Sequence, residues 1–193
     1  RSGYGTLTGQ GNGQGGREHG QKSDQLPGYG SVDDPEAVAR VAALWNVDDR
    51  RVSRKGATAA EIFERLGATI TGLFVMGSNP VVSAPSAPHL RRRLAMLAPV
   101  VVCDFFRSET TEYAHVVLPV RQWAEECGTI TNLEGRVILR DAPAEAPPGP
   151  RSDLHVLSEL AARLGTPDLL PGIEPEAVFD ELRRATAGGR ADY

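Results

Sequence analysis

A run of glycines and neutral amides near the start of the chain offers the first candidate chemistry. The glycines of residues 9–16 alternate with Gln10, Asn12 and Gln14. Glycine allows a backbone to approach a ligand closely, and carboxamides both donate and accept hydrogen bonds. This composition predicts a loop that holds a polar, phosphate-bearing ligand. A flexible linker is the alternative, but the Arg-Glu-His cluster at 17–19, directly downstream, favours the binding loop.

The same run contains glycines at 11, 13 and 16, in the G-x-G-x-x-G spacing of dinucleotide-binding folds. That fingerprint has meaning only when a strand precedes it and a helix follows. Residues 1–7 are too few and too rich in glycine for a buried first strand. The spacing therefore does not indicate a dinucleotide site.

Polar residues also follow two short apolar runs. Ser78 and Asn79 come after residues 70–76, and Asp104 comes after residues 99–103. The carboxyl ends of parallel strands share one edge of a sheet, which is where ligands bind in open α/β folds. We therefore expect these three residues to converge at that edge. The alternatives are a turn at the end of the strand for the first two and a helix cap for Asp104.

The elements that must position these residues alternate between helices and strands. Short apolar runs predict strands, and the first, nearly continuous run is typical of a strand covered on both faces. Apolar residues at helical spacing predict the intervening helices. The predicted strands are 70–76, 99–103 and 115–118, and the predicted helices are 35–46, 58–67, 86–97, 108–114, 152–164 and 175–185. Helix-length spacing between strands is that of the βαβ unit, so the prediction is an α/β fold with an open, mostly parallel Rossmann-like sheet and flanking helices.

Three further segments complete the chain. Residues 48–57 are charged and read as irregular. Residues 128–138 alternate as two short strands around a tight turn. Residues 142–150 are rich in proline and alanine, which predicts an extended connector.

Composition excludes several classes of function. The chain has 193 residues, 40% of them apolar, and a net charge of −4. It can bury a core, but it has no basic footprint for nucleic acid. No apolar run approaches the ~18 residues of a membrane helix, and no secretion pattern is present at the start. We therefore expect a cytoplasmic protein without nucleic-acid or membrane partners.

Cysteine and histidine usage predicts no metal ligand in this chain. Cys103 and Cys127 lack the paired spacing of zinc or iron–sulfur sites, and the four histidines are scattered. The sequence begins at Arg1, and the residues that follow have the pattern of the middle of a domain. We therefore expect a fragment of something longer.

Four motifs in order resemble one known family. They are Leu7-Thr8-Gly9-Gln10 with Gly15-Gly16-Arg17-Glu18; Met76-Gly77-Ser78-Asn79-Pro80; Asp104-Phe105-Phe106-Arg107-Ser108-Glu109-Thr110 with Val116-Val117-Leu118-Pro119; and Gly128-Thr129-Ile130-Thr131-Asn132-Leu133-Glu134-Gly135-Arg136-Val137. Together they cover nearly the whole chain and resemble the molybdopterin oxidoreductases, which include nitrate reductases, formate dehydrogenases and dimethyl sulfoxide reductases. One departure is His115, where many relatives have Asp.

The resemblance implies an internal part of a larger multidomain molybdoenzyme. The implied cofactor is molybdenum bis(molybdopterin guanine dinucleotide), with an iron–sulfur cluster and the molybdenum ligand in a missing N-terminal part. The implied partners are the remainder of the polypeptide and an electron donor protein. The corresponding divisions are a cofactor or active-site loop, a dinucleotide-binding α/β domain, a connector and a helical segment, at residues 1–30, 31–140, 141–150 and 151–193.

Within the family, the opening motif is most similar to assimilatory nitrate reductases. Formate dehydrogenases typically carry Arg where this chain has Thr8, and a guanidinium suits a carboxylate substrate. The implied reaction is therefore reduction of nitrate to nitrite by oxygen-atom transfer. The alternatives are formate dehydrogenase or another oxyanion reductase, and a non-catalytic relative in an electron-transfer complex.

The resemblance also implies roles for individual residues. Asp104 would accept from N1–H and the exocyclic amine of guanine, a match that adenine cannot make. Arg17 would bind nitrate through parallel hydrogen bonds, with an ion pair to Glu18 as the alternative. The implied cofactor contacts are Gly9, Gln10, Asn12, Gln14, Gly15, Gly77, Ser78, Asn79, Asp104, Thr129 and Asn132.

Overall fold

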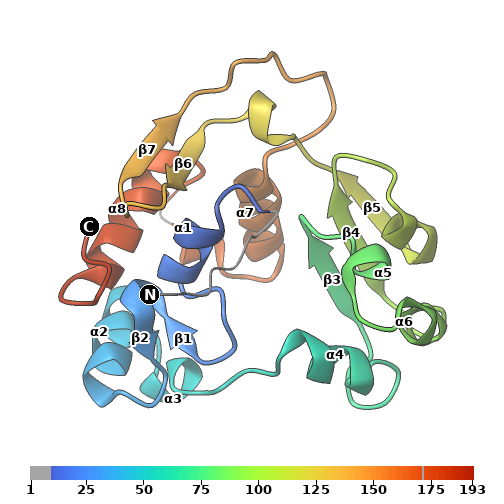
Figure 1. Cartoon of the computed structure of the whole chain (residues 1–193), viewed down its shortest axis with the longest axis horizontal. Helices are drawn as coiled ribbons and strands as arrows, with labels where there is room; N and C mark the ends of the chain where they lie inside the picture. The colour runs from blue at the N-terminus through green and yellow to red at the C-terminus, as the bar shows by residue number, and fades with distance from the viewer. Residues whose placement is uncertain (1–9, 171) are drawn as a thin grey trace, which may run out of the picture. The chain divides into compact units, whose positions relative to one another are not determined.

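The computed structural model describes residues 10–170 and 172–193, which form two compact units (Figure 1). Unit 1 contains the described residues up to Gly56, with Gly128–Arg140 and Pro175–Tyr193. Unit 2 contains Ala57–Cys127 and Asp141–Glu174. Both units combine segments far apart in the sequence, whereas the functional division predicted above uses contiguous ranges and stays a prediction.

A parallel sheet of three strands organises unit 2. The strands are β3 (Leu73–Met76), β4 (Val100–Asp104) and β5 (Val116–Pro119), with β4 in the centre. Both pairings are parallel, with Met76 opposite Cys103 and Asp104 opposite Pro119. The predicted parallel α/β architecture is therefore confirmed.

The first strand begins later than the apolar run does. Residues 70–72 follow the turn after the preceding helix, where the Gly67 N–H donates to the Ile70 carbonyl at 2.9 Å. Gly67 has a φ of +75°, a conformation that favours glycine. Turn geometry, which hydrophobicity does not report, sets this boundary.

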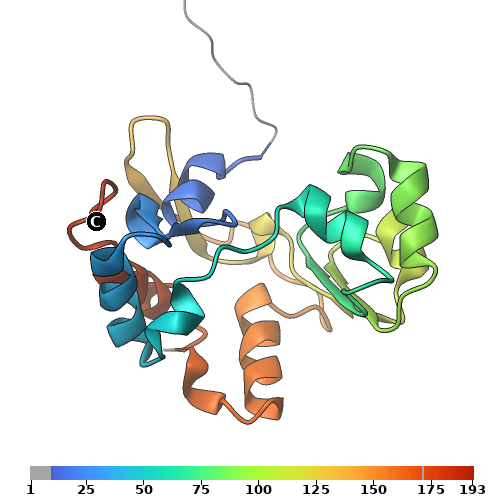
Figure 2. The same cartoon turned by 90° about the horizontal axis from the view of Figure 1, so that it is seen from below.

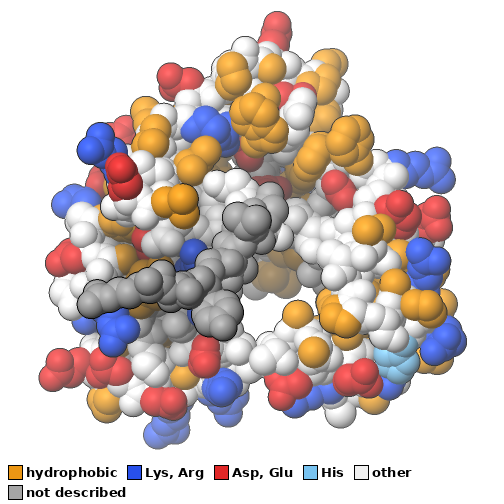
Figure 3. All heavy atoms as spheres, in the orientation of Figure 1, with side chains coloured by type: hydrophobic (Ala, Val, Ile, Leu, Met, Phe, Trp, Pro, Cys, Tyr) orange, Lys and Arg blue, Asp and Glu red, His pale blue; other side chains and the backbone are white. Residues whose placement is uncertain are grey.

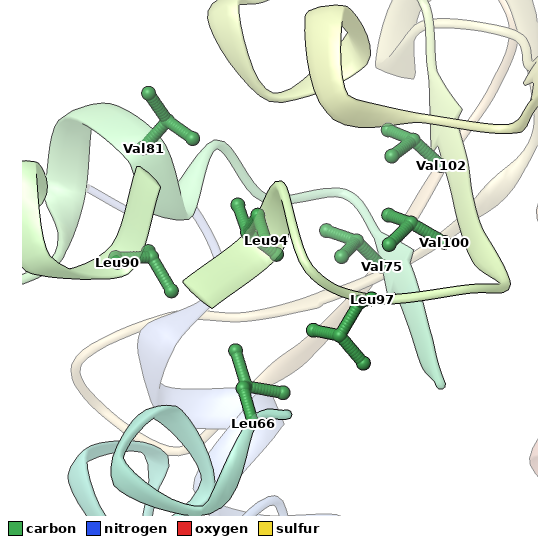
Figure 4. Close-up of a cluster of buried hydrophobic side chains, with 8 residues drawn as sticks. All are labelled: Leu66, Val75, Val81, Leu90, Leu94, Leu97, Val100 and Val102. Carbon is green, nitrogen blue, oxygen red and sulfur yellow. The ribbon is translucent and has the colours of Figure 1, made fainter. Parts of the chain in front are cut away.

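Helices cover one face of the sheet and enclose its core. They are α4 (Ala59–Arg65), α5 (Pro80–Ser83) and α6 (Ala87–Leu94). The buried cluster joins them to the strands through Leu66, Val75, Val81, Leu90, Leu94, Leu97, Val100 and Val102 (Figure 4). Helix α4 starts at a capping box, in which Thr58 and Glu61 bond reciprocally. The sequence did not predict α5.

The opposite face of the sheet is covered only in part. Helix α7 (Asp153–Arg163) contributes Val156 to a second buried cluster with Cys103 and Val120. Phe74 on β3 remains 40% exposed. The prediction that residues 70–76 are covered on both faces is therefore wrong, because the apolar contact of α7 reaches one end of this face. The 3₁₀ helices η2 (Glu109–Tyr113), η3 (Trp123–Glu125) and η4 (Pro167–Leu169) complete unit 2.

Unit 1 is built on a helical core and a hairpin. Its helices are α1 (Gly13–Glu18), α2 (Pro35–Trp45), α3 (Asp49–Val52) and α8 (Pro175–Thr186), and its strands are β1 (Gln25–Leu26), β2 (Gly30–Ser31), β6 (Gly128–Thr131) and β7 (Val137–Arg140), with the 3₁₀ helix η1 (Pro27–Tyr29). Its buried cluster includes Leu26, Val38 and Val41. The predicted hairpin is confirmed, since β6 and β7 pair antiparallel.

Helix α3 falls in a segment predicted to be irregular. Asp48 caps it by accepting from the Arg50 N–H at 2.8 Å, and Val52 joins the buried cluster. That prediction is wrong, because one capped turn with a single buried residue shows no periodicity. Among the described helices none is long and apolar enough to cross a membrane. Acidic and basic side chains are interspersed over the face seen in Figure 3.

Candidate functional site

The glycine run at the start of the chain forms a helix for most of its length. Gly13–Glu18 is helix α1, so the prediction of a loop over residues 9–16 is wrong from Gly13 onward. Gly9, with the rest of residues 1–9, lies outside the described residues. Glycine is a poor helix former, so tertiary contacts must hold α1 in place. Gly15 leaves room for one such contact, because a Cβ there would lie 2.4 Å from Oδ1 of Asn12, the atom that accepts from the Thr131 N–H.

Asn12 fastens the start of α1 to the hairpin. Its Oδ1 accepts from the Thr131 N–H at 2.9 Å, and its Nδ2 donates to the Thr129 carbonyl at 3.4 Å. The side chain thus pairs with β6 as a neighbouring strand would. In Figures 1 and 2 α1 lies beside this hairpin. The structure therefore brings together Asn12 and Thr129, two predicted cofactor contacts.

Glu18 fastens the other end of α1. It is 3% exposed, and its Oε1 accepts from Gln14 Nε2 at 2.6 Å. Its Oε2 accepts from the Tyr193 hydroxyl. Burial and the hydrogen bond to Glu18 raise the pKa of Tyr193 to about 12. Tyr193 lies in the segment after α8, so this contact links α1 to the C-terminal segment of unit 1.

Arg17 is exposed and bonded to Gln14. Its Nη2 donates to Gln14 Oε1 at 3.0 Å. No carboxylate of the described residues forms an ion pair with it. The alternative of an Arg17–Glu18 ion pair is therefore not what the structure forms, because Glu18 is buried and already bonded to Gln14 and Tyr193. Beside them, burial lowers the pKa of His19 more than the neighbouring Glu18 charge raises it.

At the carboxyl edge of the unit 2 sheet, Gly77 and Ser78 are exposed and follow β3 directly. Gly77 has a φ of +60°, and a Cβ there would meet nothing within 4 Å. Open space therefore lies over this backbone. The edge is thus accessible to a ligand at the point where topology predicted one.

Asn79 links the loop after β3 to η2. Its Nδ2 donates to Glu109 Oε2 at 2.7 Å, and its Oδ1 accepts from Thr110 Oγ1 at 2.7 Å. Thr110 is fully buried, and its Oγ1 also accepts from the Val81 N–H. The hydrogen bond from Asn79 holds the pKa of the Glu109 carboxyl below its usual value. The Asn79 amide thus fixes the shape of the edge.

Asp104 is the last residue of β4 and is partly buried. Its Oδ1 accepts from the Phe106 N–H at 3.2 Å, and its Oδ2 accepts from the Ser108 hydroxyl at 2.6 Å. These bonds close the loop after the strand. They also hold the carboxylate in one orientation at the same edge as Ser78 and Asn79.

The structure divides the predicted cofactor contacts between the units. Gln10, Asn12, Gln14, Gly15, Thr129 and Asn132 lie in unit 1, and Gly77, Ser78, Asn79 and Asp104 lie in unit 2. Asn132 shapes the hairpin turn, because its Oδ1 accepts from the N–H groups of Glu134 and Arg136. In the described part of the chain, no group of three or more His, Cys, Asp or Glu could hold a metal ion.

Sequence reasoning missed two residues of these networks. Tyr29 accepts from Gln14 Nε2 at 3.1 Å, and the Tyr193 hydroxyl donates to Glu18. Tyr193 lies 175 positions from its partner. No local pattern signals a contact at that separation, so Tyr193 could not be found from spacing. Tyr29 lies 15 positions from Gln14, which is also beyond the spacing of neighbours on one helix or strand.

The model of the molybdopterin oxidoreductase family matches residues 4–163, so the chain belongs to this family. The chain is 46% identical over 193 residues, its whole length, to the assimilatory nitrate reductase catalytic subunit of Bacillus subtilis (strain 168). It is 37% identical over 96% of its length to a nitrate reductase of Synechocystis sp.. It is 36% identical, also over 96%, to the F420-dependent formate dehydrogenase subunit alpha of Methanocaldococcus jannaschii.

The chain spans 27%, 26% and 27% of the length of these relatives. Among solved structures, acetylene hydratase from Pelobacter acetylenicus matches with a TM-score of 0.59, over 76% of this chain and 22% of its own. The sequence identity is 17%, so this likeness supports the fold alone.

Proposed function

We propose that this chain is the cofactor-binding segment of a molybdenum oxidoreductase that reduces nitrate to nitrite. The observation that carries the proposal is its 46% identity over its whole length to an assimilatory nitrate reductase, against 36% to a formate dehydrogenase. Thr8, where formate dehydrogenases typically carry Arg, agrees with this choice. The cofactor is molybdenum bis(molybdopterin guanine dinucleotide), which supplies the two-electron oxygen-atom transfer when bound.

Asp104 fits the guanine end of such a cofactor. Each oxygen of its carboxylate accepts one hydrogen bond within the loop, from Phe106 N–H and from Ser108. A carboxylate oxygen has two lone pairs, so one remains on each. Guanine presents two parallel donors, N1–H and its exocyclic amine, to such a pair. The open backbone at Gly77 leaves room for the diphosphate beside it.

In unit 1, Gln10 and Gly11 are both exposed, and a Cβ on Gly11 would meet nothing within 4 Å. They are the residues of the glycine run best placed to receive a pterin. Asn12 uses both ends of its amide on β6. A cofactor contact by Asn12 would have to use the lone pair that remains on Oδ1.

Arg17 would bind and orient the oxyanion. Its guanidinium is exposed and carries no ion pair among the described residues. A planar guanidinium donates two parallel hydrogen bonds to a planar oxyanion, which an ammonium cannot do. The remainder of the polypeptide would supply an iron–sulfur cluster, and an electron donor protein would supply the electrons, in the cytoplasm.

Activity of the full-length protein tests the proposal. We expect molybdenum and guanine nucleotide in the purified protein, nitrate reduction with a reduced dye, and little formate oxidation with an oxidised dye. Formate oxidation without nitrate reduction would favour the formate dehydrogenase alternative. A protein without molybdenum and without either activity would support the non-catalytic alternative.

Replacing Arg17 by Lys tests the substrate-binding role. Arg17→Lys keeps the charge and loses the two-pronged donor, so KM for nitrate should rise roughly tenfold with unchanged molybdenum content. Unchanged nitrate kinetics in a fully metallated Arg17→Lys protein would remove Arg17 from substrate binding.

A further inference from the structure

We propose that Gln14 is a positioning residue that orients the Arg17 guanidinium, and that the buried Glu18 determines which way the Gln14 amide faces. The proposal rests on the proposed function, in which Arg17 binds nitrate. It gives Gln14 a role in substrate affinity in place of the cofactor contact predicted from its sequence.

The direction of the Gln14 amide follows from the chemistry of Glu18. A carboxylate can only accept hydrogen bonds, so the group of Gln14 that faces it must be the NH₂. Nε2 lies 2.6 Å from Glu18 Oε1 and 3.1 Å from the Tyr29 hydroxyl, so both of its hydrogens have acceptors. Oε1 must then face outward, where it accepts from Arg17 Nη2 at 3.0 Å. An inverted amide would set its NH₂ against the guanidinium, donor against donor.

Glu18 is itself held. It is 3% exposed, and the hydroxyl of Tyr193 donates to its other oxygen. Tyr193 in turn lies 3.4 Å from the hydroxyl of the buried Thr131 on β6. The chain of contacts thus runs from the hairpin through Tyr193 and Glu18 to Gln14. It ends at the exposed Arg17.

One hydrogen bond from Arg17 to Gln14 leaves the guanidinium able to bind an oxyanion. A guanidinium has five N–H donors, arranged as two edges of paired donors. Gln14 uses one hydrogen of Nη2, so one complete edge remains whichever hydrogen is used. An arginine held at one nitrogen loses less side-chain entropy when nitrate binds, and substrate affinity should depend on that restraint.

The test uses the full-length enzyme and separates KM from kcat. Gln14→Met removes the acceptor for Arg17 and keeps a side chain of similar length. We expect KM for nitrate to rise roughly five- to tenfold, the effect of losing one typical hydrogen bond, with kcat and molybdenum content unchanged. Glu18→Gln offers an amide that no longer selects the direction of Gln14, and we expect a smaller rise in KM.

Tyr29→Phe is the matched control. It removes one acceptor of Gln14 Nε2 and leaves the selection by Glu18 intact, so KM should stay the same. A rise in KM with Tyr29→Phe equal to that with Gln14→Met would mean that any loosening of α1 has this effect, and would overturn the proposal.

A double-mutant cycle separates this inference from the proposed function. If Gln14 acts through Arg17, Gln14→Met should raise KM no further in the Arg17→Lys background. An additive effect would overturn the positioning role, as would loss of molybdenum in both Gln14→Met and Glu18→Gln. If Arg17→Lys raises KM and Gln14→Met leaves it unchanged, the inference fails and the proposed function stands. If Arg17→Lys itself has no effect, the substrate role fails first, and the positioning role with it.

Discussion

Carboxamide side chains form several of the hydrogen bonds that fix the local structure of unit 1. Asn12 pairs with the backbone of β6, Gln14 connects Glu18 to Arg17, and Asn132 closes the hairpin turn. Each of these amides was predicted to contact a cofactor. Residue type reports that an amide has donors and acceptors, and only the fold decides where they are used.

Asp104 differs, because its local bonds leave a pair of acceptors unused. In the full-length enzyme, Asp104→Asn replaces one acceptor by a donor that faces a guanine N–H. We expect this to cost about 1–3 kcal/mol of cofactor binding. The measurement is guanine nucleotide and molybdenum content after purification.

Asp141→Asn is the control for this prediction. Asp141 is an exposed carboxylate of the same unit, in the connector. The Asp141→Asn substitution should leave the cofactor content of the enzyme unchanged. Wild-type cofactor retention by the Asp104→Asn protein would show that Asp104 serves only its own loop.

The limit of residue-level prediction is visible at Asn12 and Arg17. The partner of Asn12 on β6 is 119 positions away, so no local pattern could identify it. For Arg17, the adjacent Glu18 was the obvious partner by charge. Adjacent residues on a helix do not face each other, whereas positions i and i+3 do, and the structure pairs Arg17 with Gln14.

At the scale of elements, apolar runs and helical periodicity predicted the longer helices and the strands of the parallel sheet. Helices α2, α4, α7 and α8 begin at or next to the predicted residues. Asp34, Thr58 and Ser152 cap the first three. The short helices α1, α3 and α5 were missed. Each has six residues or fewer, which is too short to show a helical period, so tertiary contacts decide them.

The first residue of α7, Asp153, has a carboxyl group whose ionised form is destabilised by burial. Burial raises the pKa of Asp153 above its usual value. One of its oxygens, Oδ1, is buried without a hydrogen-bond partner in the described structure. The folded state therefore holds the Asp153 proton more tightly than the unfolded chain. This tighter proton binding stabilises the folded state fully at pH values below 3.8, the pKa of the carboxyl in the unfolded chain. The stabilisation is lost as the pH rises through the pKa of Asp153 in the folded state.

We therefore expect Asp153→Asn to raise the Tm of the chain at pH 7. The gain should shrink as pH falls toward 3, because the wild-type carboxyl becomes neutral there. The negative charge at a helix start opposes this by ~0.3–1 kcal/mol, so the gain is modest. Thermal unfolding followed by circular dichroism between pH 3 and 7 measures it.

Asp168→Asn provides the comparison, since Asp168 is an exposed carboxylate in the first turn of η4. Its Tm should differ little from that of the wild type at every pH. A lower Tm for Asp153→Asn at pH 7 would mean that the helix-start charge outweighs burial.

At the scale of the whole molecule, the chain passes between its two units four times. The passages follow Gly56, Cys127, Arg140 and Glu174. Composition and linkers in a sequence can indicate contiguous domains. They do not indicate a unit to which the polypeptide returns twice, as it does here. The segment after residue 150 contributes to both units, because α7 covers Cys103 in unit 2 and α8 packs in unit 1, where the Ala185 carbonyl accepts from Arg40.

A cut in the connector should therefore leave the molecule in one piece. We expect a chain with a protease site inserted between Pro147 and Pro148 to yield two fragments on a denaturing gel. In native buffer the fragments should elute together by size exclusion, since the smaller one is bound within both units. Separation of the fragments without denaturant would show that α7 and α8 are only loosely held.

The four passages between the units also affect how the genes of two relatives can exchange one unit by recombination. Exchange of unit 2 between two relatives, with unit 1 left as it was, requires the transfer of Ala57–Cys127 and Asp141–Glu174 as separate tracts. That takes four recombination points, whereas a domain encoded in one stretch takes two. The two units should therefore share one ancestry, and phylogenetic trees drawn separately from their segments should agree.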